Sequence, residues 1–247
     1  MIPETSILII FLLVLPLVSF LYASVGHGGA SGYLALMALF AFPSDMMKQT
    51  ALLLNLFVAG VAFYHYYRAG HFKLKLFWPF AVCSIPAAFL GGMLNLEPGI
   101  YKKVLGVLLL FAILRIVWKG NKKDGETRSM NLIQAMFIGV AVGFFSGLIG
   151  IGGGIILTPL ILLLHWGNMK EAAAVSALFI WVNSASGLLG QFSSGVTLVS
   201  LSWIMVIIAM IGGLAGSYFG SRKWRPQLLE YFLALVLATA SLKLLFF

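Results

Sequence analysis

Two glycine clusters interrupt an otherwise strongly apolar sequence. The first is SVGHGGASGY, residues 24–33, and the second is GLIGIGGG, residues 147–154. Glycine adopts positive φ angles and lets a ligand approach the backbone closely, so each cluster predicts a break in a helix. A helix beginning directly after each cluster, near Ala30 and near Ile155, would direct unpaired N–H groups and its positive dipole end at the cluster. Two such helix ends facing one another form a binding site for a small anion without any buried cation.

Polar side chains within the apolar runs are the other candidates for chemistry. His27 lies inside the first cluster, where its imidazole could donate to a bound ligand, couple binding to protons or make a structural hydrogen bond. Asn55, Ser176 and Asn183 lie deep in apolar runs, and Ser176 and Asn183 are two helical turns apart on one face. Interhelical hydrogen bonding is the alternative role for these three. The candidate substrate-binding residues are therefore Gly26, His27, Gly28, Gly29, Ser31, Asn55, Gly150, Gly152, Gly153, Gly154, Ser176 and Asn183.

Composition places the chain in a membrane. Its 247 residues have a mean hydropathy of +1.03, and only 9% of them are charged. The net charge of +9 comes from basic residues in short gaps between apolar runs, so we interpret it as membrane topology and expect no nucleic-acid partner. A single cysteine, Cys83, provides no disulfide. The sequence lacks nucleotide-binding and metalloprotease motifs and Cys/His clusters, so we expect no enzyme, no cofactor and no metal site.

Ten apolar runs are separated by short polar or Gly/Pro-rich segments: 5–24, 29–42, 47–67, 73–94, 100–118, 131–148, 154–166, 171–191, 197–220 and 226–246. The second and seventh are too short to span a bilayer as ordinary helices. If these two segments re-enter, the loop Lys and Arg residues divide 8 to 7 between the two sides of the membrane. If both segments cross the membrane, 11 lie on one side and 4 on the other. The positive-inside rule favours ten crossings with both termini outside the cytoplasm. The minority side then carries Lys48, Lys102, Lys103 and Lys243.

The chain also resembles itself. Adding 124 carries Gly26, Gly28 and Gly29 onto Gly150, Gly152 and Gly153, and further along adding 125 carries Trp78 onto Trp203. We therefore predict an all-α polytopic membrane protein with two repeats of five segments, residues 1–118 and 131–247, joined by a polar linker, 119–130. Five crossings per repeat make the repeats inverted, and such folds bind substrate near the midplane. For the other glycine stretches, 213–220 and 91–92, we expect close helix packing instead.

The second cluster and its continuation, GLIGIGGGIILTPLILLL (147–164) and KEAAAVSALFIWVNSASGLL (170–189), are similar to the TauE/SafE family of sulfite and organosulfur permeases. The first half contains a weaker copy of this pattern, in the stretches SVGHGGASGYLALMAL, KQTALLLNLF and RAGHF. The resemblance implies a secondary transporter of small sulfur-containing anions such as sulfite, sulfoacetate or related organosulfonates, in the bacterial inner membrane. The first copy departs from the second by His27 and Ser31, and by Ala35 where Pro159 stands.

The leading hypothesis is a transporter that works by alternating access around the two clusters. Its partners are a small anionic substrate, a coupling proton and the lipid bilayer, and the sequence leaves an oligomer open. A passive anion channel is the second hypothesis. An intramembrane enzyme is the third, and it lacks recognisable catalytic groups.

Overall fold

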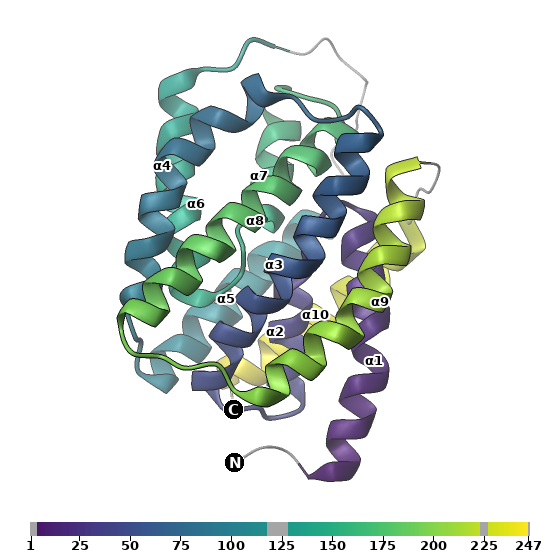
Figure 1. The fold of residues 1–247 in the computed structure, drawn as a ribbon, viewed down its shortest axis with the longest axis vertical. Helices are drawn as coiled ribbons and strands as arrows, with labels where there is room; N and C mark the ends of the chain where they lie inside the picture. The colour runs from purple at the N-terminus through teal and green to yellow at the C-terminus, as the bar shows by residue number, and fades with distance from the viewer. Residues whose placement is uncertain (1–3, 118–127, 223–226, 247) are drawn as a thin grey trace.

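The computed structural model describes the backbone of residues 4–117, 128–222 and 227–246, and their side chains except at 111, 112, 114–117 and 227–236. This described part is all helical (Figure 1). Its ten helices, in chain order, are α1 (Thr5–Ser24), α2 (Ala30–Leu39), α3 (Ser44–Arg68), α4 (Leu74–Met93), α5 (Pro98–Val117), α6 (Leu132–Ile149), α7 (Gly154–Leu163), α8 (Met169–Ser193), α9 (Ser200–Arg222) and α10 (Gln227–Phe246). Each helix corresponds to one of the ten predicted apolar runs. Most of the predicted linker, 119–130, lies outside the described residues.

Six of these helices are long and apolar enough to cross a membrane: α1, α3, α4, α6, α8 and α9. Large apolar side chains on their outer faces are exposed, including Leu13, Phe137 and Ile207, as contact with lipid requires. In contrast, α2 and α7 have 10 residues each. A helix of this length covers about 15 Å, half of the hydrocarbon core. The fold is therefore that of a multi-pass membrane protein with two half-length helices in its interior.

Glycine residues bring two pairs of helices into close contact. In α6, a Cβ atom built on Gly143 or Gly147 would overlap the carbonyl oxygen of Ser84 or Ala88 in α4. In α9, Gly212, Gly216 and Gly220 meet carbonyl oxygens of α1 in the same way. The prediction that glycines 213–220 and 91–92 serve helix packing is confirmed, because Gly91 and Gly92 also lie against the backbones of α6 and α8.

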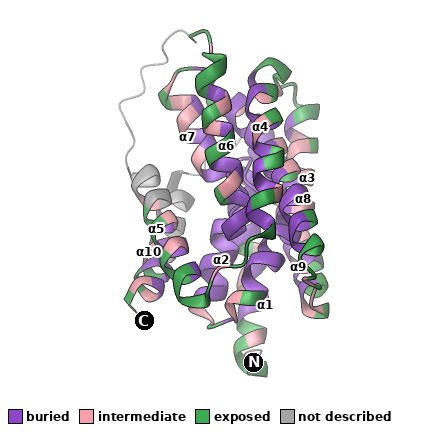
Figure 2. Cartoon of the chain, turned by 90° about the vertical axis from the view of Figure 1, so that its left-hand side faces the viewer, coloured by how far each residue is buried: buried purple, intermediate pink, exposed green. Residues whose placement is uncertain are grey.

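The two 25-residue helices, α3 and α8, occupy the centre of the molecule. They cross one another, and 72% of the residues in an apolar 18-residue stretch of each helix are buried. Figure 2 shows the buried residues concentrated around α2, α3 and α8. The half-length helices α2 and α7 pack against α3 and α8, respectively. Any residue at the middle of α3 or α8 is therefore deep inside the protein.

Lys48 corrects one expectation. The sequence suggested a loop lysine, but Lys48 lies in the second turn of α3 and is 6% exposed. Its Nζ donates to the carbonyl oxygens of Gly92 and Leu94, each at 2.9 Å, at the end of α4. Lys170 at the start of α8 likewise donates to the carbonyls of the last two residues of α9. Each lysine stabilises the C-terminal end of a neighbouring helix, where carbonyl groups lack intrahelical partners.

Candidate functional site

The N-terminal ends of α2 and α7 have no side-chain cap. Their N-cap residues are Gly29, with φ of 99°, and Gly153, with φ of 75°, and both glycines are buried. By comparison, α6 and α8 begin near the ends of the molecule and are capped by the side chains of Asn131 and Asn168. The first N–H groups of a helix need partners from outside it. In α2 and α7 these donors therefore lie in the interior, beside glycines that leave their surroundings accessible.

The two glycine clusters touch each other. Nε2 of His27 lies 3.1 Å from the carbonyl oxygen of Gly154, the first residue of α7, 127 positions further along the chain. Nδ1 of the same ring lies 3.1 Å from the carbonyl oxygen of Val25. His27 is 3% exposed. The sequence-predicted convergence of the two helix breaks is thus present as a direct contact in the structure.

Asn55, at the middle of α3, lies between the clusters. A Cβ atom built on Gly28 would lie 2.5 Å from Oδ1 of Asn55, and one built on Gly152 would overlap its Nδ2. The side chain is fully buried, and neither Oδ1 nor Nδ2 has a hydrogen-bond partner among the described residues. Buried amides almost always find partners, and leaving one unpaired costs about 1–3 kcal/mol. An unpaired amide held between two uncapped helix ends makes Asn55 a candidate binding group for a polar ligand.

Ile180, at the middle of α8, closes the other side of the same space. Its Cγ2 would lie 2.9 Å from a Cβ built on Gly28 and 2.9 Å from one built on Gly152. Adding 125 to 55 gives 180, so Asn55 and Ile180 occupy matching positions of the two sequence repeats. One repeat contributes an amide and the other an alkyl group. The site therefore has one polar and one apolar wall.

The glycines of both clusters are closely packed. A Cβ built on Gly154 would overlap the Ile180 side chain, and one built on Gly153 would lie 2.7 Å from Val142. The glycines are thus the residues that allow α3 and α8 to approach the two helix breaks.

Several sequence-predicted residues lie outside this contact. Gly26 packs against Ala173, and Gly150 packs against the backbone of Lys48. Ser31 donates to the hydroxyl of Tyr22 at 2.9 Å, an interhelical bond of the kind kept as an alternative.

The two candidates in α8 also bond within the protein. Ser176 accepts from Thr158 at 2.7 Å, which joins α7 to α8. Asn183 donates to the carbonyl of Phe179, but its buried Oδ1 has no partner among the described residues. It lies one turn after Ile180, so its free oxygen belongs to the same region of α8.

Ile180 was missed by the sequence reasoning, which searched for polar groups. Its match to Asn55 under the 125-residue offset is a signal that could have identified it. Within the described part of the chain, the structure contains no cluster of three or more His, Cys, Asp or Glu residues able to hold a metal ion.

Comparison with known proteins gives a consistent assignment. Residues 10–244 match the family model described as sulfite exporter TauE/SafE. The chain is 35% identical over 229 residues to the "Probable membrane transporter protein y4hK" of Sinorhizobium fredii. The aligned region covers 91% of this chain and 92% of that protein. The chain is 23% identical over 221 residues to the "Probable membrane transporter protein YdhB" of Bacillus subtilis, covering 86% and 89%. No solved structure matches the chain. This chain therefore belongs to the sulfite exporter TauE/SafE family and is a multi-pass membrane transporter.

Proposed function

We propose that the protein is a secondary transporter that moves a small sulfur-containing anion across the bacterial inner membrane by alternating access. Sulfite, sulfoacetate and related organosulfonates are the proposed substrates. One observation carries the proposal: the amide of Asn55 is buried without a partner between Gly28 and Gly152, beside two uncapped helix N-termini. The family description, sulfite exporter, supports the choice of sulfur anions.

The donors suit an oxyanion. Helix N-termini direct N–H groups and positive dipole ends at negative charge, and α2 and α7 do so from opposite repeats. Nδ2 of Asn55 adds a donor, and Oδ1 can accept from a protonated oxyanion such as hydrogen sulfite. Ile180 accommodates the uncharged side of the substrate, as in an organosulfonate. Because the charge is balanced by dipoles, the anion leaves more easily than it would from a buried lysine.

His27 is the proposed proton-coupling group. Both of its ring nitrogens lie 3.1 Å from carbonyl oxygens, those of Val25 and Gly154, and a carbonyl can only accept. A neutral imidazole carries one N–H and can donate to one of them, whereas the imidazolium donates to both. Protonation therefore strengthens the contact between the clusters, and deprotonation weakens it.

Repeated structure supports alternating access. The helices have 20, 10, 25, 20 and 20 residues in the first repeat and 18, 10, 25, 23 and 20 in the second. The pairing of α1 with α9 mirrors that of α6 with α4. In Figure 1, α1 rises from the N-terminus at the bottom, whereas α6 descends from the top. These features fit inverted repeats that rock about the α3–α8 crossing and expose the site to each side in turn.

Transport by reconstituted protein tests the proposal. Uptake of radiolabelled sulfite into proteoliposomes is measured for the wild type and for Asn55→Leu, which removes the hydrogen-bonding groups and keeps the branching of the side-chain heavy atoms. We expect kcat/KM to fall about 10–100-fold, the loss of one hydrogen bond to a charged group. Asn95→Leu, at an exposed loop asparagine, is the matched control and should keep wild-type kinetics.

Two results contradict the proposal. Unchanged uptake by the Asn55→Leu protein removes the site from the mechanism. Wild-type flux that rises linearly with the gradient, without saturation or counterflow, replaces the transporter by a passive channel.

A further inference from the structure

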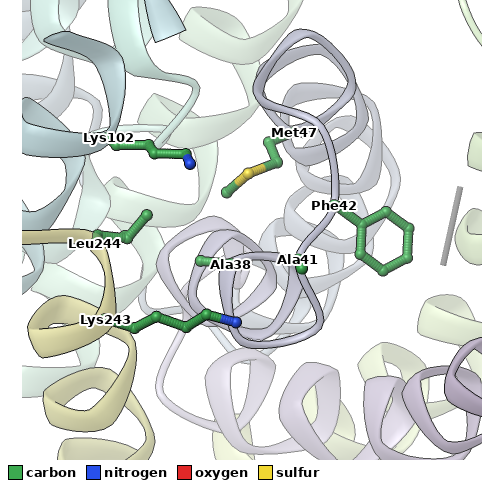
Figure 3. Close-up of a pocket in the computed structure, with 7 residues that line it drawn as sticks. All are labelled: Ala38, Ala41, Phe42, Met47, Lys102, Lys243 and Leu244. Carbon is green, nitrogen blue, oxygen red and sulfur yellow. The ribbon is translucent and has the colours of Figure 1, made fainter. Parts of the chain in front are cut away.

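A second candidate site lies at the opposite end of α2 from the glycine cluster. It is a pocket of about 110 Å³ bounded by the C-terminal end of α2 and by α3, α5 and α10. Figure 3 shows Lys102 of α5 and Lys243 of α10 extending from one side of the pocket, with Met47 opposite Lys102 and the ring of Phe42 directed away from both lysines. The space is sufficient for several heavy atoms, since one water occupies about 30 Å³ of liquid.

The charge of this pocket is not neutralised by protein carboxylates. Within the described residues the structure contains one ion pair, between Lys73 and Glu171, so Lys102 and Lys243 are paired with no described acid. Nζ of Lys243 donates to the carbonyl oxygen of Leu39 at 2.9 Å, at the last residue of α2. That bond offsets the negative end of the α2 dipole, which would otherwise repel an anion here.

Membrane topology does not explain these lysines. The positive-inside rule concentrates basic residues on the cytoplasmic side, and the predicted ten crossings would place only Lys48, Lys102, Lys103 and Lys243 on the other side. Lys48 stabilises the end of α4. Of the remaining three, two converge on this single pocket. Positive charge on the side that usually lacks it, gathered around an apolar-lined space, indicates a ligand.

We propose that this pocket binds a small oxyanion at the extracytoplasmic end of the protein. The two ammonium groups hold the charged head, and Met47 and Leu244 contact an attached alkyl group. The ten residues of α2 place the pocket about 15 Å from the central cluster. Its role as an entry or exit vestibule rests on the proposed function, whereas anion binding in the pocket does not.

Charge-selective cysteine labelling tests this site in the full-length protein in nanodiscs. Ala41 lines the pocket and is exposed, and Cys83 is the chain's one natural cysteine. In a Cys83→Ser background, Ala41→Cys is labelled by an anionic sulfonate-bearing methanethiosulfonate and by its cationic trimethylammonium analogue. We expect the anionic reagent to react faster, and methanesulfonate to slow it.

Two adjacent lysines of α5, Lys102 and Lys103, provide a test variant and its matched control. Lys102→Glu should lower the anionic-to-cationic rate ratio about tenfold, because two charge units change beside the thiol. Lys103→Glu makes the same charge change on the next residue of α5, which is exposed and does not line the pocket, and should change the ratio much less. Equal effects of the two variants overturn the proposal, as does labelling that shows no charge preference.

Two further arms separate the ligand sources and the two sites. Nanodiscs of zwitterionic phosphatidylcholine alone, compared with discs containing phosphatidylglycerol, distinguish a soluble anion from the head group of an anionic lipid. If phosphatidylglycerol protects the cysteine and methanesulfonate does not, a lipid head group is the oxyanion. Adding Asn55→Leu should leave the labelling ratio unchanged, so a failure of the central site does not affect this result. Loss of the ratio with Asn55→Leu overturns the independence of the pocket.

Discussion

The imidazole of His27 joins the two halves of the chain, because its Nε2 lies 3.1 Å from the carbonyl oxygen of Gly154. This bond connects the break after α1 to the first residue of α7, directly beside the unpaired amide of Asn55. It is a contact between helix breaks rather than between helix faces. The proposed proton coupling would therefore act at the contact between the two helix breaks.

The first prediction concerns pH. His27 is the proposed proton-coupling group, and an imidazolium can donate to both carbonyls whereas a neutral ring can donate to one, so on that proposal the ring should stabilise the protein more at low pH. His27→Ala should reduce the apparent melting temperature at pH 5.5 more than at pH 8. The difference corresponds to about 1.5–3 kcal/mol for one hydrogen bond to a charged group. Thermal unfolding in detergent at the two pH values measures it.

His165→Ala is the control for this measurement, because His165 is exposed and is distant in sequence from His27 and the first glycine cluster. It should shift the melting temperature equally at both pH values. An equal shift from His27→Ala would show that the ring does not change its protonation in this range.

The second prediction separates close contact from backbone strain at the glycines. Gly152→Ala places a methyl group onto Nδ2 of Asn55 at a residue with φ of 77°. Gly195→Ala makes the same substitution at φ of 81°, with no atom within 4 Å of the new group. Both variants carry the cost of a left-handed backbone, about 1–2 kcal/mol. Only Gly152→Ala should lose sulfite transport, measured in proteoliposomes. Similar transport by the two variants contradicts a site at this contact.

The third prediction concerns the buried lysine of α3. Lys48→Met keeps most of the side-chain volume and removes the donor from the carbonyls of Gly92 and Leu94. Leaving the buried carbonyl of Gly92 and the partly buried carbonyl of Leu94 without this partner should cost about 3 kcal/mol. At about 2–4 °C per kcal/mol, the melting temperature should fall by roughly 6–12 °C. Lys103→Met, at an exposed lysine, should change it by less than about 2 °C. Equal melting temperatures would assign Lys48 no capping role.

The fourth prediction tests the contact between α4 and α6. Gly147→Ala would overlap the carbonyl oxygen of Ala88, and backbone cannot move aside as a flexible side chain can. We expect the two helices to separate and the protein to elute as aggregate in fluorescence-detected size-exclusion chromatography. Gly99→Ala adds the same methyl group with no atom within 4 Å and should elute as wild type. A monodisperse Gly147→Ala peak would show that this crossing tolerates a wider spacing.

Much of the fold could be predicted from local sequence signals. The ten apolar runs matched the ten described helices because a bilayer-spanning helix must be apolar over most of its length, and loops between helices are short and polar. The breaks at Gly29 and Gly153 were also predictable, since both residues adopt positive φ angles that favour glycine. The short lengths of α2 and α7 followed from the same pattern.

The composition of the site was less predictable. Ser31 and Ser176 were equally polar candidates, yet the structure directs both hydroxyls into helix contacts with Tyr22 and Thr158. Ile180 carried no chemical signal, although it contacts the same glycines as Asn55. Whether a buried polar group has a hydrogen-bond partner depends on which residues of a neighbouring helix lie against it. The sequence of one helix does not show which helix will be its neighbour.

The sequence by itself determined a multi-pass helical protein with two glycine-broken segments, because apolar length and glycine content act within one segment at a time. Only the tertiary structure decided that the two breaks meet, that Asn55 lies unpaired between them, and that Lys102 and Lys243 converge on one pocket. These relationships depend on how far each helix can approach another, which is set by the contact of side chains from distant parts of the chain.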